Sequence, residues 1–60
     1  SAASIYKDIA ISLGDSFELR LLFQILKDEG LPHPHLTIRS LRESGFLVPL
    51  GESRFSWKKA

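Results

Sequence analysis

Residues 35–42 carry side chains whose types and spacing suit contact with base edges or phosphate groups. His35, Arg39 and Arg42 stand at positions i, i+4 and i+7, so a helix would place all three on one side. Arginine can donate two parallel hydrogen bonds to guanine, and a serine such as Ser40 can bond to base edges or phosphates. The pattern predicts a helix that contacts nucleic acid. The solvated basic face of an ordinary surface helix is the alternative that it leaves open.

A second set of basic residues stands near the end of the chain. Arg54 lies in a predicted strand, and Lys58 and Lys59 follow that strand. The first 31 residues carry three basic and five acidic side chains, whereas residues 32–60 carry five basic and two acidic ones. Clustered basic groups hold the phosphate backbone of nucleic acids by charge attraction. We therefore expect Arg54, Lys58 and Lys59 to contact phosphates.

Other chemistry finds little support in the sequence. His33 and His35 flank Pro34 and would supply two metal ligands, but the chain has no cysteine and no paired carboxylate near them. Exposed histidines are the simpler interpretation, and in their protonated form they could contact phosphate. The serines form no motif with a histidine and an acid, and the four glycines are isolated. We expect no enzyme, no cofactor and no metal site.

Size and composition restrict the architecture that positions these residues. The 60 residues suffice for one domain with a small core, and a hydrophobic content of 43% favours a folded chain. No apolar run approaches the roughly 20 residues of a membrane span, and no signal-peptide pattern opens the chain. We therefore expect an intracellular protein. Methionine is absent even at position 1, from which we expect a domain excised from a longer protein.

Hydrophobic periodicity predicts two helices in the first half of the chain. The first spans about residues 4–13, with Ser4 as its cap. The second spans about residues 15–29, where Asp15 and Glu18 resemble a capping box and apolar residues recur at helical spacing. A glycine directly follows each helix and is expected to end it in the left-handed conformation.

A third helix is predicted over about residues 35–44, ahead of Gly45, although Pro34 could instead be its first residue. Its two sides differ in polarity. The inner side holds Thr37, Ile38 and Leu41, and the outer side holds His35, Arg39, Arg42 and Glu43. The helix is thus expected to pack through a narrow apolar side and to expose its basic side.

Residues 46–57 change to a period of two, which predicts a β-hairpin. We expect a two-residue type II′ turn at Gly51-Glu52. That turn gives a register whose inner face holds Phe46, Val48, Phe55 and Trp57 and whose outer face holds Leu47, Arg54 and Ser56. Pro49 is expected at a sheet edge, with its missing donor outward. The elements together predict an α+β fold with a three-helix core and a C-terminal β-hairpin.

The stretch T-I-R-S-L-R-E-S-G-F-L-V-P-L-G-E-S-R-F-S-W, from Thr37 to Trp57, resembles the recognition helix and wing of winged helix-turn-helix proteins. Within that group it is most similar to the small excisionase-type regulators of phages and plasmids. The resemblance implies a winged-helix-like fold that binds duplex DNA. It also implies that Arg39, Ser40 and Arg42 occupy groove-reading positions and that Arg54 is a wing residue at the phosphate backbone.

One main expectation and one alternative follow. We expect a small DNA-binding domain of a regulatory or DNA-transaction protein, with the third helix in the major groove and the hairpin on the phosphates. Because so few contacts bind weakly, a larger parent protein or a second copy would supply affinity. The alternative is a protein-interaction or oligomerisation module that uses the apolar face of the second helix together with Leu36 and Leu47.

Overall fold

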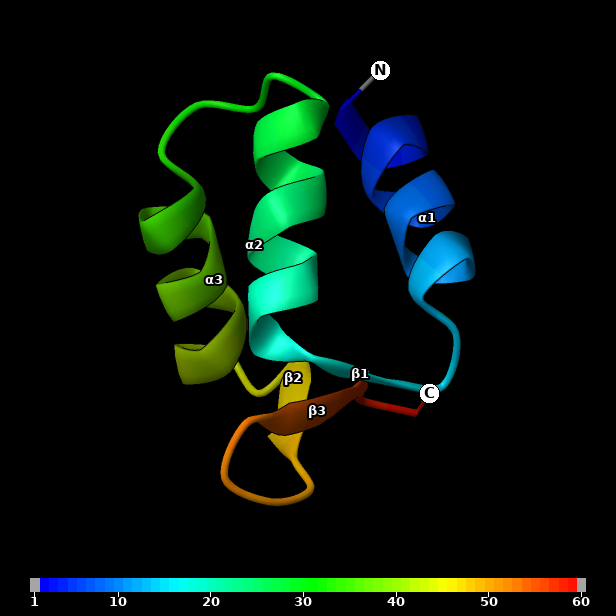
Figure 1. Cartoon of the computed structure of the whole chain (residues 1–60), viewed down its shortest axis with the longest axis vertical. Coiled ribbons are helices and arrows are strands. Elements are labelled where there is room, and N and C mark those ends of the chain that lie inside the picture. The colour runs from blue at the N-terminus through cyan, green and yellow to red at the C-terminus, as the bar shows by residue number, and fades with distance from the viewer. Residues whose placement is uncertain (1, 60) are drawn as a thin grey trace.

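Residues 2–59, the part of the chain that this computed structural model describes, form three helices and three short strands (Figure 1). In chain order these are α1 (Ala2–Leu13), β1 (Ser16–Glu18), α2 (Leu19–Asp28), α3 (Pro34–Glu43), β2 (Leu47–Pro49) and β3 (Arg54–Trp57). The predicted α+β fold, with a three-helix core and a C-terminal hairpin, is confirmed.

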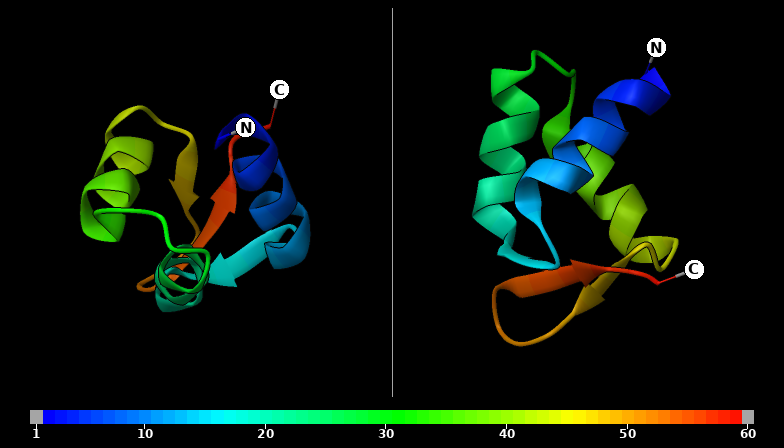
Figure 2. Two further views of the ribbon diagram at one scale, coloured as in Figure 1. Left: turned by 90° about the horizontal axis from the view of Figure 1, so that it is seen from above. Right: turned by 90° about the vertical axis from the view of Figure 1, so that its right-hand side faces the viewer.

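The sheet closes one end of the helical layer. Helix α2 stands between α1 and α3, and the view along α2 shows the three helices at the corners of a triangle (Figures 1 and 2). The strand order is β1-β3-β2, and both pairs are antiparallel. Since β1 comes between α1 and α2 in the chain, the central strand β3 joins the hairpin to the N-terminal half.

The first two helices begin elsewhere than predicted. Helix α1 starts at Ala2, so Ser4 lies inside the helix and is not its cap. Residues 16–18, predicted as helix, form β1, and Glu18 precedes α2 with an extended backbone and no side-chain capping bond. The predicted capping box is therefore wrong. Phe17 is buried and pairs with Phe55 of β3, a partner far along the chain that outweighs the local helical pattern.

Helix α2 ends at Asp28, and Gly30 follows its C-cap residue Glu29 in the left-handed conformation that the sequence predicts. The Gly30 N–H donates to the Lys27 carbonyl at 2.9 Å and the Leu31 N–H to the Leu26 carbonyl at 3.1 Å, which together form a Schellman motif. Gly30 has a φ of 73°, a left-handed conformation that glycine adopts without steric cost.

Helix α3 begins at Pro34, the alternative start that the sequence leaves open, and ends at Glu43. Proline fits the first helical position because that position needs no donor. His33 precedes it with a φ of 51°, and its carbonyl accepts hydrogen bonds from the first turn of the helix. The link between α2 and α3 thus ends in a residue, His33, whose backbone has the left-handed conformation.

The hairpin is paired one residue away from the predicted register. Leu47 faces Trp57 across the strands, and the loop between the strands runs from Leu50 to Ser53. Gly51 lies outside the left-handed region, so the predicted type II′ turn at Gly51-Glu52 is wrong. Because a shift by one residue exchanges the faces of a strand, Leu47 is 3% exposed and Phe46 is 58% exposed, the reverse of the prediction.

Two hydrogen bonds account for the longer loop. The Leu50 N–H donates to the Arg54 carbonyl at 2.8 Å, which closes the loop. The Leu19 N–H donates to the Ser53 carbonyl at 2.9 Å and so fastens the loop to the start of α2. This second bond satisfies a helix-terminal donor that has no partner within its own helix.

The core lies where the helices meet the sheet. Its buried members are Ile9, Leu13, Phe17, Leu22, Leu26, Ile38, Leu47 and Phe55. Trp57 packs against them half-buried, with its ring centroid 5.2 Å from that of Phe17. Ile38, the buried residue of α3, lies on the predicted inner side of that helix. Leu47 was expected on the outer face of the hairpin, and Phe17 belongs to a strand that was not predicted.

Candidate nucleic-acid interface

Helix α3 presents two different sides, as the sequence predicts. Ile38 is buried, and Thr37 and Leu41 are half-buried against the rest of the domain. His35, Arg39, Arg42 and Glu43 are all exposed. Because only a narrow apolar strip holds the helix in place, most of its circumference is open to a ligand.

The basic flank of α3 forms one wall of a groove that α2 and the hairpin complete. The groove encloses about 940 Å³. His35, Arg39 and Arg42 line it from α3, and Arg20 and Phe23 line it from α2, while Pro49 and Ser53 of the hairpin close its end. The three residues singled out from their spacing therefore lie together, beside a further arginine.

The three groove arginines differ in how they are held. The Arg39 Nε lies 3.5 Å from the Glu43 Oε1, and the Arg20 Nε lies 2.9 Å from the Glu18 Oε2. Exposed pairs of this kind contribute about 0–1 kcal/mol, so both arginines can exchange a carboxylate for a phosphate at small cost. The guanidinium of Arg42 lies 5.3 Å from the centre of the Phe55 ring and, within residues 2–59, forms no ion pair.

Helix α2 adds cationic residues that the sequence interpretation missed. Arg20, Phe23 and Lys27 are spaced i, i+3 and i+7 and so share one side of the helix. The Lys27 Nζ lies 5.6 Å from the centre of the Phe23 ring, and that ring stacks on His35 of α3 with centroids 4.4 Å apart. The spacing of the two basic residues was visible in the sequence. The many apolar residues of this helix predict a scaffold role, which leaves its two cations unassigned.

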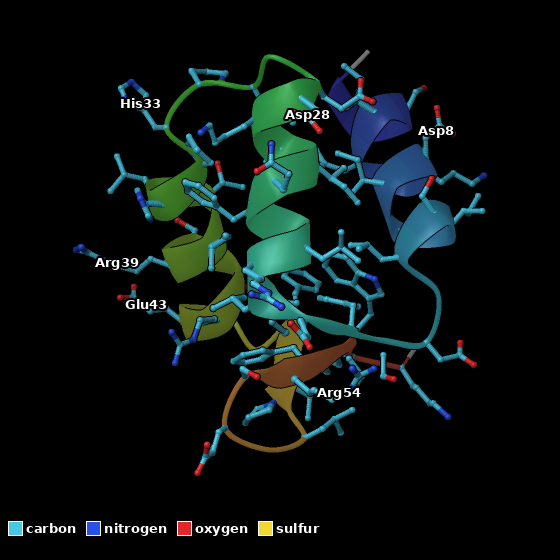
Figure 3. The ribbon with its side chains drawn as sticks, viewed as in Figure 1. Asp8, Asp28, His33, Arg39, Glu43 and Arg54 are labelled. Carbon is cyan, nitrogen blue, oxygen red and sulfur yellow. The ribbon has the colours of Figure 1, made fainter. Side chains whose placement is uncertain are left out.

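Arg54 lies apart from this groove. Its Nη2 donates to the Ser16 Oγ at 2.9 Å, which ties it to β1. Figure 3 shows Arg39 extending outward from α3 at the left of the view and Arg54 beside the sheet, away from α3. Arg54 lines a neighbouring depression, whose lining shares Arg20 with the groove and also includes Leu21. The loop of the hairpin carries Glu52, which is exposed and acidic.

The remaining predicted contacts also lie on other faces. Lys58 and Lys59 line a depression with Asp15 beside the connection between α1 and β1. Ser40 lies on the opposite flank of α3, in a depression of about 580 Å³ that Tyr6 and Phe46 also line. The structure thus gathers His35, Arg39 and Arg42 and separates them from Ser40, Arg54, Lys58 and Lys59.

Among residues 2–59, no three potential metal ligands of the histidine, cysteine, aspartate or glutamate type cluster together. Over the same residues, no helix combines the length and the apolar character needed to cross a membrane. In comparisons with protein-family models, curated proteins and solved structures, the chain matches none of them.

Proposed function

We propose that the domain binds duplex DNA, with α3 in the major groove and the cations of α2 beside it on the phosphates. The observation that carries the proposal is the clustering of His35, Arg39 and Arg42 on one exposed flank of α3, next to Arg20 of α2. An α-helix with its side chains is about 10–12 Å across, which matches a major groove about 12 Å wide.

The roles of the basic residues follow from where they lie. Arg39 extends outward from α3, and its one ion pair among residues 2–59 is with its helical neighbour Glu43, so it is placed to reach a base edge (Figure 3). Arg20 and Lys27 stand on the neighbouring helix and are assigned to the phosphate backbone. Arg54, Lys58 and Lys59 face other directions, so this proposal removes them from the expected set of phosphate contacts.

The test is a titration with a mixed-sequence duplex, followed by amide chemical shifts at low and moderate salt. We expect shifts in residues 20–27 and 35–42. For the two phosphate contacts of Arg20 and Lys27 the affinity should fall about 12-fold between roughly 50 and 200 mM salt. Arg39→Ala should weaken binding by roughly 1–3 kcal/mol and relax the preference at one base position.

Lys59→Ala is the matched control, because it also removes one exposed positive charge but lies away from the groove. It should change the affinity less than about twofold. Equal losses in the two variants would mean that only the net charge of the domain matters, and shifts confined to residues 54–59 would place the interface elsewhere. Absence of binding at low salt would remove DNA as the ligand.

A second candidate function is self-association through the outer face of β2. Phe46, Val48 and Leu50 alternate along this edge strand, and all three are exposed, by 37% to 58%. The predicted surface on α2 is not free, since Leu22 and Leu26 are buried, and neither is Leu47. The occupant we propose for the β2 row is a second copy of this chain, because an alternating row can meet itself across a twofold axis.

A further inference from the structure

Leu36 is a large apolar side chain in an exposed position on α3. It is 55% exposed and lies in the first turn of the helix, two residues after Pro34. The core side of α3 is built around Ile38, with Leu41 half-buried beside it. Leu36 lines the open depression that Tyr6 and Phe46 also line. Packing within the domain therefore accounts for less than half of its surface.

The neighbours of Leu36 on the helix surface are polar. Arg39 and Ser40 follow it by three and four residues, so the outward side of α3 runs from Arg39 on the groove flank across Leu36 to Ser40 on the other flank. A helix in the major groove contacts base edges mainly through its N-terminal residues. Leu36 occupies such a position, and it is the apolar member of the outward set.

We propose that Leu36 contacts the C5-methyl group of a thymine and gives the domain a preference for thymine at that position. The inference rests on the proposed binding of α3 in the major groove. The thymine methyl is the apolar group that the four standard base pairs present there. Water leaves both the methyl group and the exposed leucine surface on contact, which favours binding.

The spacing of the side chains predicts where the thymine stands. Three residues advance a helix by about 4.5 Å, close to the roughly 3.4 Å between successive base pairs. The thymine read by Leu36 and the guanine read by Arg39 should therefore be adjacent or separated by a single base pair. The same reasoning makes DNA the ligand, since the major groove of duplex RNA is too deep and narrow for side chains to read.

The experiment isolates the methyl group. Selection from a random duplex library first gives a preferred site for the wild-type domain. That site is then prepared with deoxyuridine in place of each thymine in turn, which removes one methyl and leaves the base pairing intact. We expect one replacement to weaken binding about fourfold, the value for one buried methyl group. Leu36→Ala should bind the thymine and deoxyuridine duplexes equally, and Leu36→Met should keep the preference.

Leu21→Ala is the control variant, because Leu21 is a similarly exposed leucine on α2 that lies outside the groove beside α3. It should retain the full preference for thymine. If the wild-type domain binds every deoxyuridine duplex as tightly as the parent, or if Leu36→Ala still discriminates, the role of Leu36 is refuted while salt-dependent DNA binding stands. If no duplex binds at low salt, the proposed function and this inference both fail.

Discussion

Gly30 holds a backbone conformation that an alanine would adopt only at a cost. Its φ of 73° lies in the left-handed region, and no atom lies within 4 Å of the place where a β-carbon would stand. Gly30→Ala should therefore destabilise the fold through the backbone alone, by about 1–2 kcal/mol. Chemical denaturation of the two proteins measures the difference, which should appear in the midpoint with the slope unchanged.

Gly51 offers the matched control in the hairpin loop. It is equally open to a β-carbon but lies outside the left-handed region. Gly51→Ala should leave stability unchanged or raise it by up to about 1 kcal/mol, because alanine restricts the unfolded chain. A loss similar to that of Gly30→Ala would contradict the backbone assignment and would favour the type II′ turn that the sequence predicts.

The positions of some site residues follow from local helical geometry, and the positions of others do not. The grouping of His35, Arg39 and Arg42 followed from helical spacing, which needs no information from the rest of the chain. The position of Arg54 depends on its pairing with β1, a strand that the sequence did not indicate. Arg54 is exposed, as predicted, but its hydrogen bond to Ser16 of β1 could not be anticipated from the hairpin alone.

At the scale of elements, the hairpin register decides which side chain supports the core. Leu47 is buried among core residues, whereas Phe46 faces outward. Leu47→Ala should cost about 2–5 kcal/mol, the range for a buried leucine. Phe46→Ala should cost less than about 0.5 kcal/mol, as expected for a surface position. Thermal or chemical unfolding of the two variants measures both values, and the reverse order would restore the predicted register.

The strands show where local sequence stops being informative. Phe46, Leu47 and Val48 are all apolar, so alternation alone does not distinguish the two possible registers. The loop length decides between them, and the Leu19–Ser53 hydrogen bond that fixes it joins residues far apart in the chain. The helices were predictable because their periodicity and glycine ends are local. Strand β1 and the hairpin register were not predictable in this way, because both depend on how β3 pairs with other strands.

On the scale of the whole molecule, the distribution of charge over the folded surface differs from the distribution of charge along the sequence. The first half of the sequence is acidic overall, yet it supplies Arg20 and Lys27 to the side of α2 that faces α3. The basic second half sends Lys58 and Lys59 to another face. The surface beside α3 is thus basic because of how α2 and α3 pack, and the asymmetry along the chain did not predict it.

Self-association would join the two candidate functions in one assembly. A domain with three or four cations at its interface binds DNA weakly, and linking two copies can raise the avidity about 10²–10⁴-fold. Contact along the strand edge is disfavoured because Pro49 lacks a donor, which leaves the outer face with Phe46, Val48 and Leu50 as the meeting surface.

We expect sedimentation velocity to show a monomer converting to a dimer as concentration rises. Val48→Lys, at the centre of the row, should keep the fold and abolish the dimer, because burial of two facing ammonium groups is unfavourable. Leu21→Lys makes the same change at an exposed leucine of α2 and should leave the dimer intact. A wild-type domain that stays monomeric at every concentration, or a Val48→Lys variant that still dimerises, would exclude this face, and the additional DNA contacts would then have to come from a larger parent protein.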